Sequence, residues 1–229
     1  MPRDTLRILA GEVTGCTLCP RLVAHRREMA RIKRRAYMDW DYWGKPVPPF
    51  GDPRARLLIV GLAPAAHGGN RTGRMFTGDR SGDFLYRALH ETGFASQPTS
   101  VSREDGLTLT GVYITAAVRC APPDNKPLPE EFQRCRPYLE RELDLLRNLR
   151  VVVALGKLAF DAYLGILRDH GVIRSRGAFA FGHDVHYRIP GAPDLVSSYH
   201  PSQQNTSTGK LTSGMLRQVF ERVGAILQE

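Results

Sequence analysis

An alternation of short apolar runs with helical patterns constrains the fold of this chain more than any other feature. The apolar runs are typical of buried strands and occupy 56–61, 112–118, 150–155 and 195–199. Helical patterns follow at 83–92, 130–149, 156–164 and 211–227. This alternation predicts an α/β protein, a three-layer α/β/α sandwich around a central, mostly parallel four-stranded sheet. Ligands of such sheets bind at the carboxyl ends of the strands, so the loops after 61, 118 and 199 are candidate sites.

The length of 229 residues fits one domain spanning 1–229, and we expect a monomer. No apolar run approaches the roughly 18 residues that a membrane span needs. The first residues, Met1 to Asp4, lack the apolar stretch of a secretion signal, so we expect a cytoplasmic protein with no membrane partner. Residues 165–194 have weak periodicity and are expected to form a loop or a small hairpin.

The charge of the chain favours a polyanionic partner. Lysine and arginine number 32 against 23 acidic residues, a net charge of +9. Basic residues concentrate in 21–35, and four aromatic residues follow at Tyr37, Trp40, Tyr42 and Trp43. A basic segment beside aromatic side chains suits phosphate contacts combined with base stacking. A solvated helix face is the alternative interpretation of the same segment.

The four cysteines form a pattern typical of a metal site. Cys16 and Cys19 make a C-x-x-C pair, and Cys120 and Cys135 come from distant parts of the chain. Cytosolic proteins seldom use disulfides, which favours metal. Free buried thiols, a redox-active C-x-x-C pair and a structural zinc site are the alternatives. Ligand type alone does not separate zinc from an iron–sulfur cluster, because both accept four thiolates.

Two loops have compositions that suggest binding. The loop 61–79 is rich in glycine and small residues, which let the backbone approach a ligand closely. The second loop, 200–205, has the sequence His-Pro-Ser-Gln-Gln-Asn. A flexible surface loop and a polar turn with a solvent-facing histidine are the respective alternatives.

Taken together, these motifs resemble the uracil-DNA glycosylase superfamily, and within it the iron–sulfur branch called family 5 or type B. The resemblance covers nearly the whole chain and includes the C-x-x-C pair, the loop Gly-Leu-Ala-Pro-Ala-Ala-His-Gly, the stretch 118–123, Cys135 and the His-Pro-Ser loop. It implies an α/β/α sandwich and a DNA base-excision repair enzyme that removes uracil. It also implies one structural [4Fe-4S] cluster on Cys16, Cys19, Cys120 and Cys135, with an N-terminal cluster-binding segment of about 1–50.

The chain departs from related families at two positions that bear on specificity. Family 4 enzymes carry a carboxylate just after the first strand, where this chain has Leu62 and Ala63. Many relatives have an asparagine on the second strand to read the uracil edge, and the stretch here is Thr115-Ala116-Ala117. Without a polar side chain that hydrogen-bonds the edge of uracil, the pocket no longer penalises bases that cannot form that hydrogen bond. We therefore expect activity on other deaminated or modified bases, such as hypoxanthine and ethenocytosine.

The resemblance and the chemistry of base removal assign roles to individual residues. His200 is expected to donate a hydrogen bond to the carbonyl of the departing base, as imidazole or imidazolium. Asp79 is expected to orient water or stabilise the sugar cation, with a helix cap as the alternative. Asn125 is expected to read the base or position water, with a plain turn as the alternative. Phe76 is expected to stack on the base, and the pocket is expected to include Gly61, Ala63 and His67.

Other residues are predicted to hold the DNA. Ser202, Gln203 and Asn205 are expected to press into the duplex after the target base has flipped out. Candidate phosphate contacts are Arg71, Arg74, Lys126 and Lys210. Two other functions remain open at this point: a non-catalytic nucleic-acid-binding protein with a decayed site, and a zinc-stabilised hydrolase of small substrates. Recruitment by a repair clamp is left open.

Overall fold

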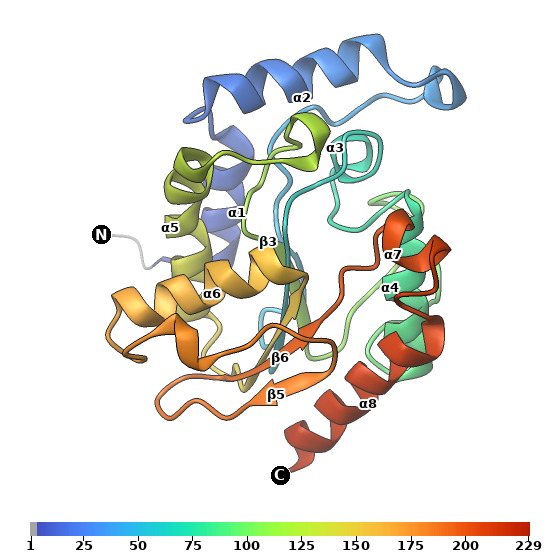
Figure 1. Ribbon diagram of the computed structural model, residues 1–229. Coiled ribbons are helices and arrows are strands. Elements are labelled where there is room, and N and C mark those ends of the chain that lie inside the picture. Colours follow the sequence, from blue (N-terminus) through green and yellow to red (C-terminus); the bar gives the residue numbers. More distant parts are fainter. Residues whose placement is uncertain (1–3) are drawn as a thin grey trace.

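The computed structural model describes residues 4–229, so the first three residues of the predicted N-terminal segment lie outside the described residues. A single sheet runs through the molecule with the strand order β1-β3-β2-β4-β6-β5 (Figure 1). Its strands are β1 (Phe50–Gly51), β2 (Leu57–Gly61), β3 (Val112–Ala116), β4 (Val151–Leu155), β5 (Val185–Tyr187) and β6 (Asp194–Ser198). The four strands predicted from apolar runs are the inner, mutually parallel ones.

The predicted count of four strands is wrong, because each edge carries one more short strand. Strand β1 pairs antiparallel with β3, and β5 pairs antiparallel with β6. The stretch 165–194, expected to form a loop or a small hairpin, contains the three-residue strand β5, which pairs with β6 as part of the sheet. Edge strands escape a search for apolar runs because they are short and only half-buried.

Helices cover both faces of the sheet and make the predicted three layers (Figure 1). On one face, α4 (Arg80–Glu91) and α8 (Ser213–Gln228) pack against strand residues such as Ile59. On the other, α5 (Pro129–Leu145) and α6 (Lys157–Asp169) pack against residues such as Leu58. Successive strand side chains point to opposite faces, and both faces are covered, so β2 is apolar and buried along its whole length.

The remaining helices gather near the carboxyl ends of the strands or at the N-terminus (Figure 1). They are α1 (Leu6–Gly15), α2 (Pro20–Ile32), α3 (Gly69–Thr72) and α7 (Gln203–Ser207), with short 3₁₀ turns η1 (Arg35–Tyr37), η2 (Pro123–Asn125) and η3 (Arg176–Ala178). Helix α1 packs on α5, and α2 lies over α3. Within residues 4–229, no helix is both long and apolar enough to cross a bilayer.

The strand order creates a switch point beside β2. The chain leaves β2 towards β3 on one side, and β3 then connects to β4 on the other side of β2. Crevices at the carboxyl ends of strands beside such a point are the usual ligand sites of parallel α/β sheets. The fold therefore places the loops after β2, β3 and β6 around one location.

Candidate active site

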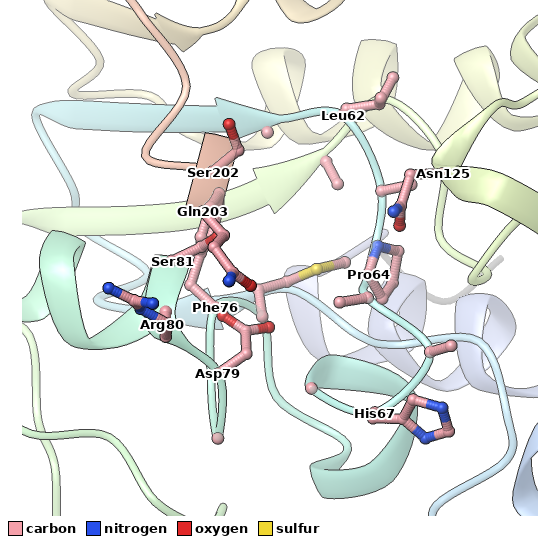
Figure 2. A pocket seen from close by; sticks show the side chains of 18 of the residues that line it. Leu62, Pro64, His67, Phe76, Asp79, Arg80, Ser81, Asn125, Ser202 and Gln203 are labelled. Carbon is pink, nitrogen blue, oxygen red and sulfur yellow. The ribbon is translucent and has the colours of Figure 1, made fainter. Parts of the chain in front are cut away.

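A cavity of about 810 Å³ opens at the carboxyl ends of the strands (Figure 2). Nine of the residues predicted for the site line it: Gly61, Ala63, His67, Phe76, Asp79, Asn125, His200, Ser202 and Gln203. In the view of Figure 2, Asn125 and Pro64 lie on one side, and Asp79, Ser202 and Gln203 lie on the other. Three further predicted site residues, Arg71, Arg74 and Asn205, are not among those that line the cavity.

Glycines allow the Phe76 ring to lie against the end of β2. A Cβ atom at Gly61 would lie only 2.8 Å from the ring, so a larger residue there would push the ring away. Phe76 itself has a φ of 51°, in the left-handed region that an aromatic residue rarely adopts. Such strain persists where the surrounding structure enforces it, often at ligand sites. The local structure thus presents the ring to the cavity at an energetic cost.

Asp79 is a helix cap and also lies at the cavity. It is the N-cap of α4, and its side chain accepts a hydrogen bond from the backbone N–H of Gly82 at 3.0 Å. It also lines the cavity. A Cβ atom at Gly68 would overlap its second carboxylate oxygen, so the approach of the two loops requires glycine. Burial raises the pKa of Asp79, and the N–H groups of Gly82 and Ser81 partly oppose that rise.

His200 is held as an uncharged imidazole. Burial lowers its pKa to about 4, because the imidazolium form would lose solvation without gaining a carboxylate partner. Its ring lies 5.8 Å from the Phe76 ring, centre to centre, at a tilt of 33°. Gly156, with a φ of +95°, leaves room for it, since a Cβ atom there would lie 3.2 Å from the His200 Cβ. The side-chain amide of Asn205 donates to the His200 carbonyl at 2.8 Å.

The end of β3 presents no polar side chain to the cavity. Ala116 lines it, whereas the Thr115 hydroxyl donates to the buried carboxylate of Glu142 at 2.7 Å. The amide of Asn125 enters from the η2 turn instead. Asp124 and Asn125 have φ values of 53° and 56°, so two consecutive residues adopt the left-handed conformation. Asparagine and aspartate tolerate this conformation in turns, so the turn itself does not separate a functional role from a plain turn, and Asn125 is placed by its position at the cavity wall.

The predicted phosphate contacts at Arg71 and Arg74 require correction. Both side chains are buried, and both guanidinium groups are committed to internal partners. Arg74 forms an ion pair with Asp105 at 2.6 Å and donates to Ser100, while Arg71 donates to the carbonyls of His67 and Gly78. The sequence alone shows that these residues are cationic, but their burial depends on how the loop folds back on itself. Asn205 also has an inward partner, the His200 carbonyl.

Other cations do lie at the cavity and were missed as individual site residues. The arginines Arg34 and Arg80 line it, and so does the aromatic Tyr37. Arg34 and Tyr37 belong to the basic and aromatic segment after α2, so the sequence signal was the charge concentration in 21–35. Lys126 and Lys210 are exposed, as phosphate contacts would need to be. Cations thus line the cavity, and among residues 4–229 Asp79 contributes its one carboxylate.

The four cysteines surround a second, much smaller cavity. Cys16 and Cys19 lie at the junction of α1 and α2, Cys120 follows β3, and Cys135 lies in α5. All four are free thiols. Burial raises the pKa of Cys120 to about 12 and that of Cys135 to about 11, so both stay protonated at neutral pH unless a cation binds. In the part of the chain that is described, no three such ligands converge on a point as a single metal ion would require.

A buried arginine, Arg26, lies beside the cysteines. Arg26 is 3% exposed, and its guanidinium donates to the carbonyls of Gly44 and Cys16. Its Nε has no hydrogen-bond partner among the described residues. The backbone N–H of Arg119 also points at this site, donating to the Cys135 Sγ at 3.3 Å. A desolvated guanidinium is costly without a nearby anion, so this donor set fits a bound cluster with thiolate ligands.

Comparison with known proteins connects this site to one family. The model of the uracil DNA glycosylase superfamily matches residues 48–224. The chain is 54% identical to a type-5 uracil-DNA glycosylase of Thermus thermophilus, over 91% of this chain and 92% of that protein. It is 51% identical to the type-5 uracil-DNA glycosylase of Mycobacterium tuberculosis, over 91% of this chain and 76% of that protein. It is 46% identical to the type-5 uracil-DNA glycosylase of Pyrobaculum aerophilum, over 98% of this chain and 94% of that protein.

Proposed function

Because this chain belongs to the uracil DNA glycosylase superfamily and is a DNA glycosylase, we propose that it hydrolyses the N-glycosidic bond of uracil in DNA. One observation carries this proposal beyond the similarity. A single cavity brings together an aromatic ring, an uncharged imidazole, a carboxylate and an amide, in Phe76, His200, Asp79 and Asn125. A decayed site on a non-catalytic DNA-binding protein has no need to keep all four together.

The reaction separates charge, and the cavity has a group suited to each side. Cleavage of the bond leaves negative charge on the base and positive charge on the deoxyribose. His200, neutral at physiological pH, donates an N–H to the carbonyl oxygen on which the negative charge develops. A neutral imidazole keeps one N–H, so it can donate this hydrogen bond without first being protonated. The base lies against Phe76, whose ring is next to the imidazole.

Asp79 faces the sugar side of the bond in this mechanism. Two backbone N–H groups at the start of α4 fix the carboxylate, and burial raises its pKa. In its ionised form it orients the attacking water and stabilises the developing sugar cation. A desolvated carboxylate interacts more strongly with that cation than an exposed one would. His200 on the base side and Asp79 on the sugar side thus act on opposite ends of the bond that breaks.

We further propose that the pocket accepts hypoxanthine and ethenocytosine as well as uracil. Ala116 occupies the wall of the cavity at the end of β3, and its methyl side chain neither donates nor accepts a hydrogen bond. Hydrogen bonding to the edge of the base then depends on Asn125, which lies in the η2 turn and not in a strand. A turn-borne amide adapts to several base edges more easily than a strand residue does. Specificity therefore comes from shape and stacking more than from a rigid set of hydrogen bonds.

We propose that one [4Fe-4S] cluster binds to Cys16, Cys19, Cys120 and Cys135. Four thiols line one small cavity, and four thiolates are the ligand set that a [4Fe-4S] cluster takes. When bound, the cluster supplies cross-links among the N-terminal helices, the loop after β3 and α5. Cys120 lies five residues before Asn125, so the cluster supports the wall of the cavity and takes no part in bond cleavage.

An excision panel tests the proposed function. Oligonucleotides carrying one uracil, hypoxanthine or ethenocytosine are incubated with the wild-type protein and with His200→Ala, and free base is measured. We expect release of all three bases by the wild type and a large loss in the variant. Release of uracil alone would overturn the broad specificity. DNA binding without any base release would favour the non-catalytic alternative.

A colour measurement tests the cofactor. We expect purified protein to be brown with broad visible absorption and about four irons per chain, as a [4Fe-4S] cluster requires. Colourless protein with stoichiometric zinc would overturn the cluster and restore the zinc alternative.

A further inference from the structure

Arg71 is a buried cation with an unusual set of partners. It lies in α3, and its side chain is 3% exposed. The Nε donates to the His67 carbonyl at 2.8 Å, and Nη2 donates to the Gly78 carbonyl at 2.7 Å. The third nitrogen, Nη1, has no hydrogen-bond partner within residues 4–229. An unsatisfied donor of this kind is costly, so its environment must offset the loss in another way.

Two aromatic rings provide that environment. The guanidinium carbon lies 3.8 Å from the centre of the Tyr37 ring and 4.1 Å from that of Trp40. The rings meet at 79°, with centres 6.4 Å apart, and so form a corner around the cation. The negative faces of the two rings attract the desolvated guanidinium. Arg71 therefore attaches the segment after α2 to the loop that carries Asp79.

The loop side of this contact leads directly to the proposed carboxylate. Gly78 immediately precedes Asp79, and its φ is +75°. A Cβ atom at Gly78 would overlap Nη2 of Arg71, so the glycine allows the guanidinium to reach the carbonyl. Further backbone bonds join the same two segments, from the N–H of Trp43 to the Arg71 carbonyl at 2.9 Å and from Gly44 to Asn70 at 3.0 Å.

We propose that Arg71 is a positioning residue that sets the place of Asp79 through the Gly78 carbonyl and docks the Tyr37–Trp40 corner at the mouth of the cavity. This inference rests on the proposed function, because Asp79 is given a role only there. Tyr37 itself lines the cavity, so docking its ring completes the wall. Lysine is a poor replacement for Arg71. Its ammonium group has no planar face to stack on the two rings and lacks the spread of N–H donors that reaches both carbonyls.

Arg71→Met and Arg71→Lys, with Arg74→Lys as the matched control, test the proposal. Arg74 lies three residues along the same loop and is equally buried, but its guanidinium pairs with Asp105, and it is not among the residues lining the cavity. The first measurement is the single-turnover rate of uracil release from a single-stranded oligonucleotide as a function of pH. We expect Arg71→Met to lower the maximal rate about 100-fold, the scale of a roughly 1 Å misplacement, and Arg74→Lys to lower it much less.

The pH profile separates positioning from a general structural effect. The charged and titratable groups around Asp79 are Asp83 and Arg80 on its own helix, Arg71 from α3, and His67 and His200 across the cavity. Removing the Arg71 charge raises the pKa of Asp79, so the acid limb of the profile moves to higher pH in Arg71→Met. Arg71→Lys keeps the charge and the acid limb while recovering only part of the rate. If the acid limb of the pH–rate profile of Arg71→Met coincides with that of the wild type, the proposed positioning of Asp79 is overturned.

Limited trypsin digestion tests the docking of the aromatic corner without relying on activity. Lys33, Arg34 and Arg35 offer cleavage sites next to that corner. We expect Arg71→Met to be cut there severalfold faster than the wild type, and Arg74→Lys to be cut at the wild-type rate. Equal cleavage of wild type and Arg71→Met would overturn the docking. If the wild type releases no base, the proposed function fails, and the digestion still decides the docking.

Discussion

The side-chain amide of Asn205 donates a 2.8 Å hydrogen bond to the backbone carbonyl of His200. Asn205 lies in α7, directly after the His-Pro-Ser sequence, and Ser202 caps this helix by accepting from the Asn205 backbone N–H. The bond closes the loop on itself and holds the imidazole against Phe76. A residue predicted to contact DNA thus acts on the orientation of the histidine.

Replacing Asn205 by alanine removes this bond without touching the cavity lining. We expect a fall in the single-turnover excision rate of roughly fivefold, because one neutral hydrogen bond contributes about 1 kcal/mol. The affinity for DNA containing an uncleavable uracil analogue should change little. Gln204→Ala, an exposed neighbour on the same helix, serves as the control. A loss of DNA affinity equal to the loss of rate would contradict the positioning role.

Gly68 is expected to tolerate no side chain, because a Cβ atom there would overlap the Asp79 carboxylate. Gly68→Ala should therefore displace the carboxylate and lower the excision rate by about 100-fold, the scale of a roughly 1 Å misplacement. The matched control is Gly165→Ala in α6, where no atom lies within 4 Å of the added Cβ. Rates are measured on uracil-containing single strands and stability by thermal unfolding. Gly165→Ala should keep the rate and gain about 0.5–1 kcal/mol of stability. Wild-type activity in Gly68→Ala would contradict the requirement for a fixed Asp79 carboxylate.

The low pKa of His200 makes a prediction about stability. Its folded-state pKa of about 4 is below the ordinary value of 6.5, so the unfolded chain binds the additional proton between those values. The stabilising contribution is complete above pH 6.5 and is lost as the pH falls towards 4. We expect the thermal midpoint to fall less steeply over this window in His200→Gln than in the wild type. Parallel falls in both proteins would show that the imidazole is not desolvated.

Arg26 is expected to matter for retention of the proposed cluster. Arg26→Met removes the buried cation beside the cysteines, so the visible absorption should decay faster under a chelator such as EDTA in air. Arg31→Met on the same helix is the control, since Arg31 is exposed and pairs with Glu28. Cys120→Ser should lose the absorption outright. Equal decay in Arg26→Met and the wild type would mean that the arginine does not compensate the cluster charge.

Most of the fold follows from local pattern. The inner strands are continuous apolar runs because both of their faces are covered, and such runs can be recognised from the sequence alone. The edge strands β1 and β5 lack this signal, since their stability comes from pairing with β3 and β6. The residues lining the cavity were largely predicted because they stand on loops at the carboxyl ends of those inner strands.

The sequence by itself determined the four inner strands with the long helices between them, the glycine-rich loop and most of the candidate residues of the cavity. These features depend on residue type and spacing, which are visible in one dimension. The tertiary structure alone decided the environment of each side chain. It turned Arg71 and Arg74 inward, gave Asn205 a partner in His200, and lowered the pKa of His200 to about 4 by burial. Burial and hydrogen bonding depend on which distant segments meet, and only the folded chain specifies those contacts.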